Sequence, residues 1–173
     1  MARGIMIMGL NGCGKTTVGR ETAARLGLLR MDAEDYYFSE PGDYSLSRPE
    51  EEAHRLMEED IRRHDGFVLS CVRCNVTEEI LASVRLAVVL RASPELRSRR
   101  ILQREIDRFG GRVLPGGDLY EQQQAFHAFA AARSEALVTE SLSRLKCPVV
   151  EMDASLPVEQ IAERICQLWL AAR

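Results

Sequence analysis

The sequence lacks a basic excess, a long apolar run and a signal-peptide pattern, and each absence argues against a class of protein. Its formal net charge is −3, whereas general nucleic-acid and membrane-surface binders carry a surplus of Lys and Arg. No apolar run approaches the roughly 20 residues of a membrane span, and Arg3 leads directly into a strand-like stretch. We therefore expect a cytoplasmic protein that binds neither nucleic acid nor membranes.

The five cysteines are an odd set without the spacing of a disulfide framework, which predicts reduced thiols. Cys71 and Cys74 have the spacing of metal ligands, but no second Cys or His pair supplies the four ligands of a structural zinc site. Cys13 differs because it lies near Lys15 in a glycine-rich loop, where a thiolate would be stabilised. Cys13 is thus either a site of oxidative inactivation or an ordinary small loop residue.

Residues 9–16 fit the phosphate-binding pattern G-x-x-x-x-G-K-[ST] without a mismatch. An apolar run at residues 5–8 and a helical pattern at residues 17–26 place strand, loop and helix in the required order. Backbone N–H groups of such a loop point at an anion, while Lys15 reaches the outer phosphates and Thr16 binds Mg²⁺. The predicted site for ATP and Mg²⁺ comprises Gly9, Asn11, Gly12, Cys13, Gly14, Lys15, Thr16 and Thr17.

An acidic cluster made of Asp32, Glu34 and Asp35 follows a second predicted strand at residues 28–31. Ligands bind at the carboxyl ends of strands in open α/β sheets. One carboxylate can orient water on Mg²⁺ while another accepts a proton from a substrate hydroxyl. We predict these two roles for the cluster; the alternative is that the carboxylates only cap the helix that follows.

Strands and helices alternate along the rest of the chain. Further strands are predicted at residues 67–70, 86–90 and 148–152, and helices at residues 49–63, 77–83, 94–108, 119–145 and 158–171, with a turn-rich segment before the first of these helices that includes residues 41–43. This alternation implies a parallel sheet with right-handed crossovers. Since no repeat or linker interrupts it, we expect one α/β domain over residues 1–173.

Several arginines are candidates for contact with anions. Glycine pairs flank Arg112, so residues 105–120 are predicted to form a lid that closes over phosphates and adds positive charge; the alternative is an exposed loop whose charges serve solubility. Arg48 and Arg55, within a predicted substrate-binding segment at residues 36–64, either bind an anionic substrate or pair with neighbouring glutamates.

The pattern resembles the small P-loop kinases of the shikimate kinase, gluconate kinase and adenylate kinase group over nearly the whole chain. The resemblance implies a three-layer P-loop NTPase fold with a five-stranded parallel sheet of order 2-3-1-4-5 and a small lid. Asp32-Ala33-Glu34 is similar to the D-x-D element of shikimate and gluconate kinases, which implies Asp32 in the magnesium shell and Glu34 at the substrate. The loop at residues 153–157, including Pro157, is similar to the adenine pocket.

Arginine positions extend the resemblance. Arg55 is similar to the helix arginine that binds the acidic substrate of shikimate kinases. Arg112 and Arg133 occupy places similar to the phosphate-directed arginines of the lid and the following helix, with Arg104 and Arg108 as further candidates. The chain departs from shikimate kinases after the third strand, where residues 71–73 replace a glycine triplet.

The combined prediction is ATP- and Mg²⁺-dependent phosphoryl transfer to a small, anionic metabolite, carried out by a monomer or homodimer. The predicted catalytic residues are Lys15, Asp32, Glu34, Asp35 and Arg112, and the predicted substrate-binding residues are Glu34, Arg48, Arg55, Arg73 and Arg133. Two alternatives stay open. In a nucleoside monophosphate kinase, Arg48, Arg55 and Arg73 would bind the acceptor phosphate, whereas a nucleotide-binding regulator would transfer nothing.

Overall fold

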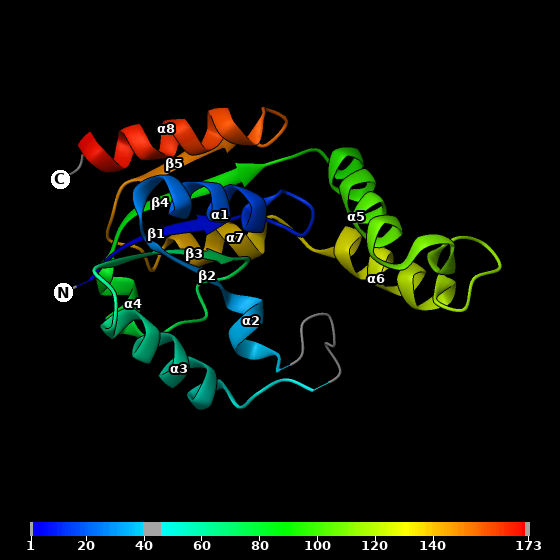
Figure 1. Ribbon diagram of the computed structural model, residues 1–173, viewed down its shortest axis with the longest axis horizontal. Helices are drawn as coiled ribbons and strands as arrows, with labels where there is room; N and C mark the ends of the chain where they lie inside the picture. The colour runs from blue at the N-terminus through cyan, green and yellow to red at the C-terminus, as the bar shows by residue number, and fades with distance from the viewer. Residues whose placement is uncertain (1, 40–45, 172–173) are drawn as a thin grey trace.

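The computed structural model describes residues 2–39 and 46–171. Five strands form one parallel sheet in the order β2-β3-β1-β4-β5, which confirms the predicted architecture and strand order (Figure 1). The strands are β1 (Arg3–Met8), β2 (Leu29–Asp32), β3 (Gly66–Cys71), β4 (Val84–Arg91) and β5 (Val149–Asp153).

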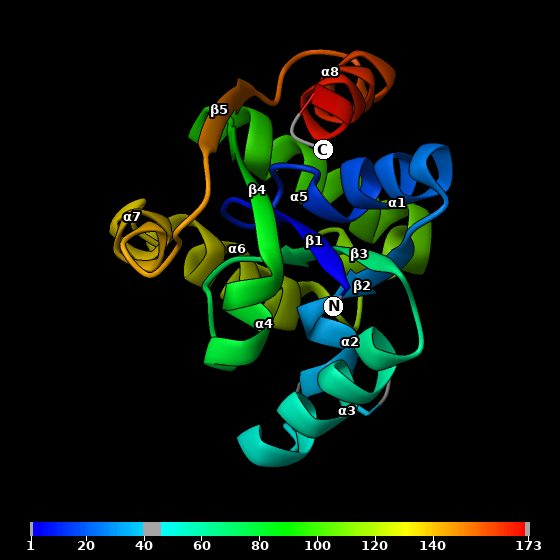
Figure 2. The same ribbon diagram turned by 90° about the vertical axis from the view of Figure 1, so that its left-hand side faces the viewer.

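Helices cover both faces of the sheet. They are α1 (Lys15–Leu26), α2 (Ala33–Tyr37), α3 (Glu50–Arg62), α4 (Glu78–Ser83), α5 (Pro94–Phe109), α6 (Tyr120–Ala132), α7 (Ala136–Leu142) and α8 (Val158–Ala171), with a 3₁₀ turn, η1 (Gly110–Val113), between α5 and α6. In the view along the strands, α1 and α8 lie on one side of the sheet and α4 and α7 on the other (Figure 2). Among the described residues, no helix combines the length and the apolar character needed to cross a membrane.

The three central strands, β3, β1 and β4, carry near-continuous apolar runs because both faces of the sheet are covered. Ile5 in β1 is fully buried and pairs with Val68 in β3 on one side and Leu86 in β4 on the other. The edge strands β2 and β5 are only partly buried. The loop that leaves the end of β1 therefore starts from the most rigidly held strand of the domain.

Helices α5 and α6 form a hairpin, the arm, which projects beyond the carboxyl ends of the strands (Figure 1). Ser93 begins α5 by accepting a hydrogen bond at Oγ from the Leu96 N–H, at 3.2 Å, with Pro94 in the first turn. Within the arm, Nε2 of His127 on α6 lies 2.8 Å from Oε2 of the buried Glu105 on α5. This pair joins the two helices of the arm.

The structure corrects two elements of the sequence prediction. The helix predicted at residues 119–145 is divided into α6 and α7, because the backbone of Arg133 is extended and Oγ of Ser134 accepts a hydrogen bond from the Ala136 N–H at 3.1 Å. The short helix α2 was not among the predicted helices, and its last two residues overlap residues 36–48, the segment predicted to be turn-rich. Oδ1 of Asp32 caps α2 by accepting from the Glu34 N–H at 3.2 Å. The turn predicted at residues 41–43 lies outside the described residues.

Candidate active site

The loop after β1 wraps around a space that the protein leaves open. Gly12 and Gly14 adopt φ values of 84° and 92°, which side chains disfavour. A Cβ atom at Gly12 would also lie 2.5 Å from the carbonyl oxygen of Arg97 on α5. Residues 11–18 line a cavity of about 1020 Å³. Gly12 thus allows the loop to lie directly against α5. The cavity beside this contact is large enough for a small-molecule ligand.

Lys15, the first residue of α1, turns back along this loop. Its Nζ donates a hydrogen bond to the carbonyl oxygen of Leu10 at 3.2 Å. Burial lowers the pKa of Lys15, while the carboxylates of Glu34 and Asp32 act in the opposite direction, and Glu34 has the larger effect. An anion bound beside Lys15 would compensate for the partial loss of water around its ammonium group.

Thr16 and Asp32 place two oxygen atoms together on the cavity wall. The Thr16 hydroxyl donates to Oδ2 of Asp32 at 2.7 Å, and Asp32 is 8% exposed. Mg²⁺ is usually held by one or two protein oxygens together with water and phosphate oxygens. Among the described residues, no group of three or more His, Cys, Asp and Glu could hold a metal ion. The Thr16 and Asp32 oxygens therefore fit a magnesium ion that a nucleotide brings with it.

A carboxylate and two guanidinium groups also line the cavity. Glu34 in the first turn of α2, Arg73 after β3 and Arg133 after α6 all line the cavity. Nη1 of Arg133 donates to Oδ1 of Asn11 at 2.9 Å, and its guanidinium lies 5.3 Å from the ring centre of Phe129. Burial lowers the pKa of Arg133; the positive charge of Arg73 adds to this effect, and Glu34 opposes it. The guanidinium groups of Arg73 and Arg133, which line one cavity, could together bind an anionic ligand.

Arg100 on α5 connects the phosphate loop to the segment after β5, and the sequence analysis did not single it out. Its guanidinium donates to the carbonyl oxygens of Cys13, at 3.3 Å, and Ala154, at 2.8 Å. Arg100 and Arg104 both line the cavity. With Arg97 they have the spacing i, i+3, i+7 of one helix face, a signal in the sequence that could have identified Arg100.

The loop between β5 and α8 closes the cavity next to Arg100. Ala154, Leu156 and Val158 line it, whereas Pro157, the residue predicted to contact the nucleotide, does not. Three apolar residues, two from this loop and one from the start of α8, thus border the cavity.

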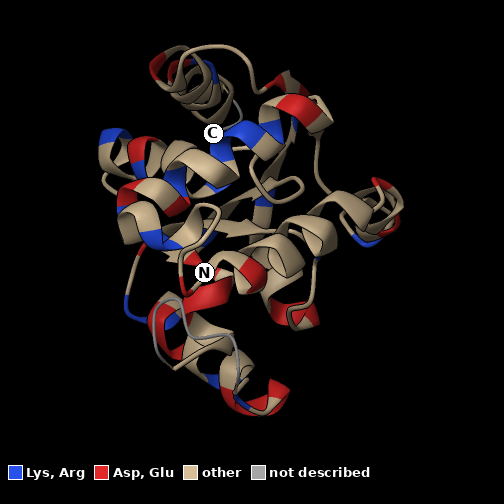
Figure 3. Ribbon diagram, turned by 90° about the vertical axis from the view of Figure 1, so that its right-hand side faces the viewer, with Lys and Arg blue, Asp and Glu red and all other residues tan. Residues whose placement is uncertain are grey.

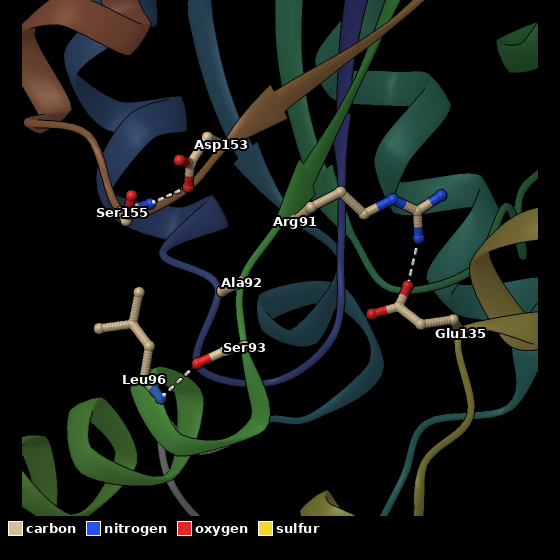
Figure 4. A pocket seen from close by; sticks show the side chains of 7 residues that line it. All are labelled: Arg91, Ala92, Ser93, Leu96, Glu135, Asp153 and Ser155. Carbon is tan, nitrogen blue, oxygen red and sulfur yellow. Dashed lines mark hydrogen bonds and ion pairs between the residues drawn. The ribbon is translucent and has the colours of Figure 1, made fainter.

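A second cavity of about 600 Å³ lies on the other side of this loop, at the ends of β4 and β5 (Figure 4). Its charged groups are already paired. Arg91 contacts Glu135, and its Nη2 lies 2.6 Å from Oε1 of Glu151. Oδ1 of Asp153 accepts a hydrogen bond from the Ser155 N–H at 2.8 Å. These contacts connect β4, β5 and the segment before α7, so they account for the charges here without a ligand.

Two arginines predicted in the lid lie away from the large cavity. Nη2 of Arg112 pairs with Oδ2 of Asp118 at 2.6 Å with its side chain 58% exposed, and the Arg108 guanidinium lies 5.0 Å from the ring centre of Phe109. The cause is the length of α5, since 16 residues span about 24 Å and carry residues 110–118 to the far end of the arm. This placement does not support the predicted phosphate contacts of Arg108 and Arg112.

Arg48 and Arg55 likewise do not line the cavity. Nη1 of Arg48 donates to three carbonyl oxygens near the end of α2, at 2.7, 3.2 and 3.3 Å. Nη1 of Arg55 donates to Oε1 of Glu59 at 2.6 Å on the exposed face of α3. The first is a structural cap of α2 and the second is a surface ion pair, which the sequence analysis had considered as the alternative role.

Asp35 does not share the environment of Glu34. Its carboxylate lies 3.2 Å from Nη1 of Arg30 and is 52% exposed, and it does not line the cavity. Since α2 turns by about 100° per residue, adjacent carboxylates on it point in different directions. Glu34, unlike Asp35, therefore faces the cavity.

The structure contradicts the predicted reactivity of Cys13. The side chain is 1% exposed, and burial raises the pKa of its thiol despite the opposing effect of Lys15. The burial of Cys13 agrees with the alternative interpretation, in which it is an ordinary small residue of the loop. Cys71 and Cys74 are also buried, and Sγ of Cys74 lies 3.3 Å from Sδ of Met6 in the core.

Residues 5–108 match the model of the family AAA_18, described as an AAA domain. The chain belongs to this AAA domain family. It is 28% identical to the uncharacterized protein YqaC of Bacillus subtilis (strain 168), over 95% of this chain and 96% of YqaC. This match extends past residue 108, so the similarity to YqaC includes the arm and the last strand and helix.

Solved structures show the same fold as this AAA domain protein. A shikimate kinase from Acinetobacter baumannii, in complex with shikimate, superposes with a TM-score of 0.56 at 20% identity, over 100% of this chain and 96% of the kinase. A sugar kinase from Janibacter sp. HTCC2649 superposes with a TM-score of 0.55 at 20% identity, over 99% and 96% of the two chains. The predicted similarity to the fold of the small P-loop kinases is confirmed.

Proposed function

We propose that the protein transfers the γ-phosphoryl group of ATP to a hydroxyl group of a small anionic metabolite, with Mg²⁺ bound to the nucleotide. One observation supports this most. A single cavity brings together the phosphate loop with Lys15, the Thr16–Asp32 oxygen pair, the carboxylate of Glu34 and the guanidinium of Arg133. A nucleotide-binding switch would need only the first two of these features, whereas phosphoryl transfer also needs groups that position an acceptor.

The nucleotide would extend along the phosphate loop. Backbone N–H groups of residues 12–16 and the ammonium group of Lys15 would bind the phosphates, and the base would lie between Arg100 and the apolar residues Ala154 and Leu156. Thr16 and Asp32 would hold Mg²⁺, which supplies positive charge that neutralises the phosphate oxygens. These groups would orient the γ-phosphorus toward the side of the cavity where Glu34 lies.

The acceptor would bind between Glu34 and the two arginines, Arg73 and Arg133. Glu34 would accept the hydroxyl proton as the hydroxyl oxygen bonds to the γ-phosphorus, and the bond from the γ-phosphorus to the bridging oxygen would break, releasing ADP. Arg73 and Arg133 would bind the anionic group of the acceptor and so hold its hydroxyl toward the γ-phosphorus. Carboxylates and guanidinium groups in this arrangement perform positioning and charge stabilisation, which are the main contributions of a protein to phosphoryl transfer.

The test is a transfer assay with ATP and Mg²⁺ against sugar acids, shikimate-like acids and nucleoside monophosphates, with ADP and phosphorylated product both measured. Lys15→Ala should abolish turnover and leave the circular dichroism spectrum unchanged. Lys146→Ala is the matched control, because Lys146 is the only other lysine of the chain and is exposed. Wild-type turnover in Lys15→Ala, or tight ATP binding with no transfer to any acceptor, would overturn the proposal.

A further inference from the structure

Aromatic side chains dominate the acceptor end of the cavity. This end lies between α6 of the arm and the segment that starts at α2, and its apolar lining comes from Tyr37, Phe38, Val72, Phe126 and Phe129. Figure 3 views the molecule from the side of the arm; acidic and basic residues are spread over this view, and acidic ones are also found in its lower part, where α2 and α3 lie. The acceptor end thus combines an apolar lining with a small number of charged groups.

Phe129 is an apolar residue left open to the cavity. It is 56% exposed although it lines the site, and its ring centre lies 6.4 Å from that of Phe126 at an interplanar angle of 33°. The guanidinium of Arg133 lies over the same ring, 5.3 Å from its centre. A ligand whose anionic group meets Arg133 would therefore place its body beside two phenyl rings, which favour a flat apolar partner.

Two uncharged polar side chains at this end, Tyr37 and Asn75, already make hydrogen bonds within the protein. The Tyr37 hydroxyl donates to the carbonyl oxygen of Asn75 at 2.7 Å and lies 2.9 Å from Nε2 of His54. Nδ2 of Asn75 donates to Oε2 of Glu50 at 3.3 Å. An acceptor with many hydroxyl groups would leave several of them without partners, and each unpaired hydroxyl weakens binding by about tenfold.

Three charged groups that line the cavity, Arg73, Arg133 and Glu34, match one anion and one hydroxyl. Arg73 and Arg133 offer positive charge. Glu34 lines the same cavity, and its negative charge opposes the lowering of the pKa of Lys15 and Arg133 by burial. A carboxylate next to the anion site disfavours a doubly charged phosphate by repulsion. A single negative charge, such as that of a carboxylate, fits this balance better than the phosphate of a nucleoside monophosphate.

We propose that the acceptor is a hydroxy acid with a flat apolar ring and few other hydroxyl groups. This inference rests on the proposed kinase function and specifies its substrate class. The carboxylate of the acceptor meets Arg73 and Arg133, the ring lies against Phe126 and Phe129, and the reactive hydroxyl faces Glu34. Its oxygen bonds to the γ-phosphorus while its proton passes to Glu34 and ADP leaves.

Ligand binding tests the substrate class separately from catalysis. Calorimetry with the wild-type protein, Mg²⁺ and a non-hydrolysable ATP analogue compares 4-(hydroxymethyl)benzoate, which has one ring and one hydroxyl, with gluconate and AMP. We expect 4-(hydroxymethyl)benzoate to bind at least about tenfold more tightly than either. Equal affinities, no binding of the ring acid, or tighter binding of gluconate or AMP would overturn the inference.

Variants of the aromatic residues test the site itself. Phe126→Ala and Phe129→Ala should each weaken binding of the ring acid by about tenfold and leave the affinity for the ATP analogue unchanged. Phe109→Ala is the matched control, because Phe109 lies at the end of α5 against Arg108 and does not line the cavity. Unchanged affinity for the ring acid in both cavity variants would overturn the inference. If the ring acid binds as expected but no phosphorylated product forms from ATP, the kinase proposal fails and the ligand class stands.

Discussion

Arg133, directly after α6 where the arm returns to the sheet, donates from Nη1 to Oδ1 of Asn11 in the phosphate loop at 2.9 Å, although 122 positions separate the two residues in the chain. This hydrogen bond holds a guanidinium group on the boundary between the nucleotide and acceptor parts of the cavity. We expect Arg133→Met to lower kcat/KM for the acceptor by about 100-fold or more, because the anionic group of the acceptor loses a charged hydrogen-bond partner inside the cavity. Steady-state kinetics with the acceptor identified in the transfer assay measures this loss.

Arg55→Met is the control for this variant. Arg55 was expected from the sequence to bind the substrate, but it lies on α3 with its side chain 57% exposed and paired with Glu59. An exposed ion pair on a helix contributes little to stability, so kcat/KM should change less than about twofold. A loss in Arg55→Met as large as that in Arg133→Met would restore the original assignment.

Glu34 and Asp35 provide a test of which carboxylate serves the acceptor. Glu34→Gln should lower kcat by about 100-fold or more while KM for ATP changes little, because proton acceptance is lost but the nucleotide contacts remain. Asp35→Asn should keep kcat within about threefold of wild type, since Asp35 pairs with Arg30 outside the cavity. The reverse ranking of the two variants would assign the acceptor role to Asp35.

The parts of the site that the sequence predicted are those in which a local pattern carries all the information. The phosphate loop is continuous in sequence, and Asp32 and Glu34 directly follow a strand whose end must lie at the ligand edge of the sheet. Arg55 and Arg112 were assigned by their order along the chain, but the direction of a helical side chain depends on packing and helix length. Ten more residues of helix move such a group by about 15 Å, and a shift of two residues along a helix turns it to nearly the opposite face.

The thiols should be unreactive near neutral pH in the native protein. Burial raises the pKa of Cys74 to about 11 and raises the pKa of the thiols of Cys13, Cys71, Cys147 and Cys166. A raised pKa keeps a thiol protonated to higher pH, so the reactive thiolate is scarce at pH 7 and increases only in alkaline solution. Titration with a disulfide reagent should be slow at pH 7 in native protein and should reach five thiols in denaturant. Rapid modification of Cys13 at pH 7, identified by peptide mapping, would contradict this expectation.

Gly4 in β1 lies against the ring of Phe67, its neighbour in β3, and this contact predicts that the fold needs a glycine at position 4. A Cβ atom at Gly4 would lie 2.2 Å from the ring of Phe67, which is fully buried and surrounded by the core. We expect Gly4→Ala to lower the free energy of unfolding by about 1–3 kcal/mol, because the ring must move within a packed interior. Urea denaturation measures the change.

Gly111→Ala is the control for Gly4→Ala, since a Cβ atom at Gly111 meets nothing within 4 Å. The stability of Gly111→Ala should stay within about 0.5 kcal/mol of wild type or rise slightly. Phe67→Leu should reduce the cost of Gly4→Ala in the double variant, because the two residues are in contact and their effects are coupled. Additive effects of these two substitutions would show that the loss in Gly4→Ala has another cause than the ring of Phe67.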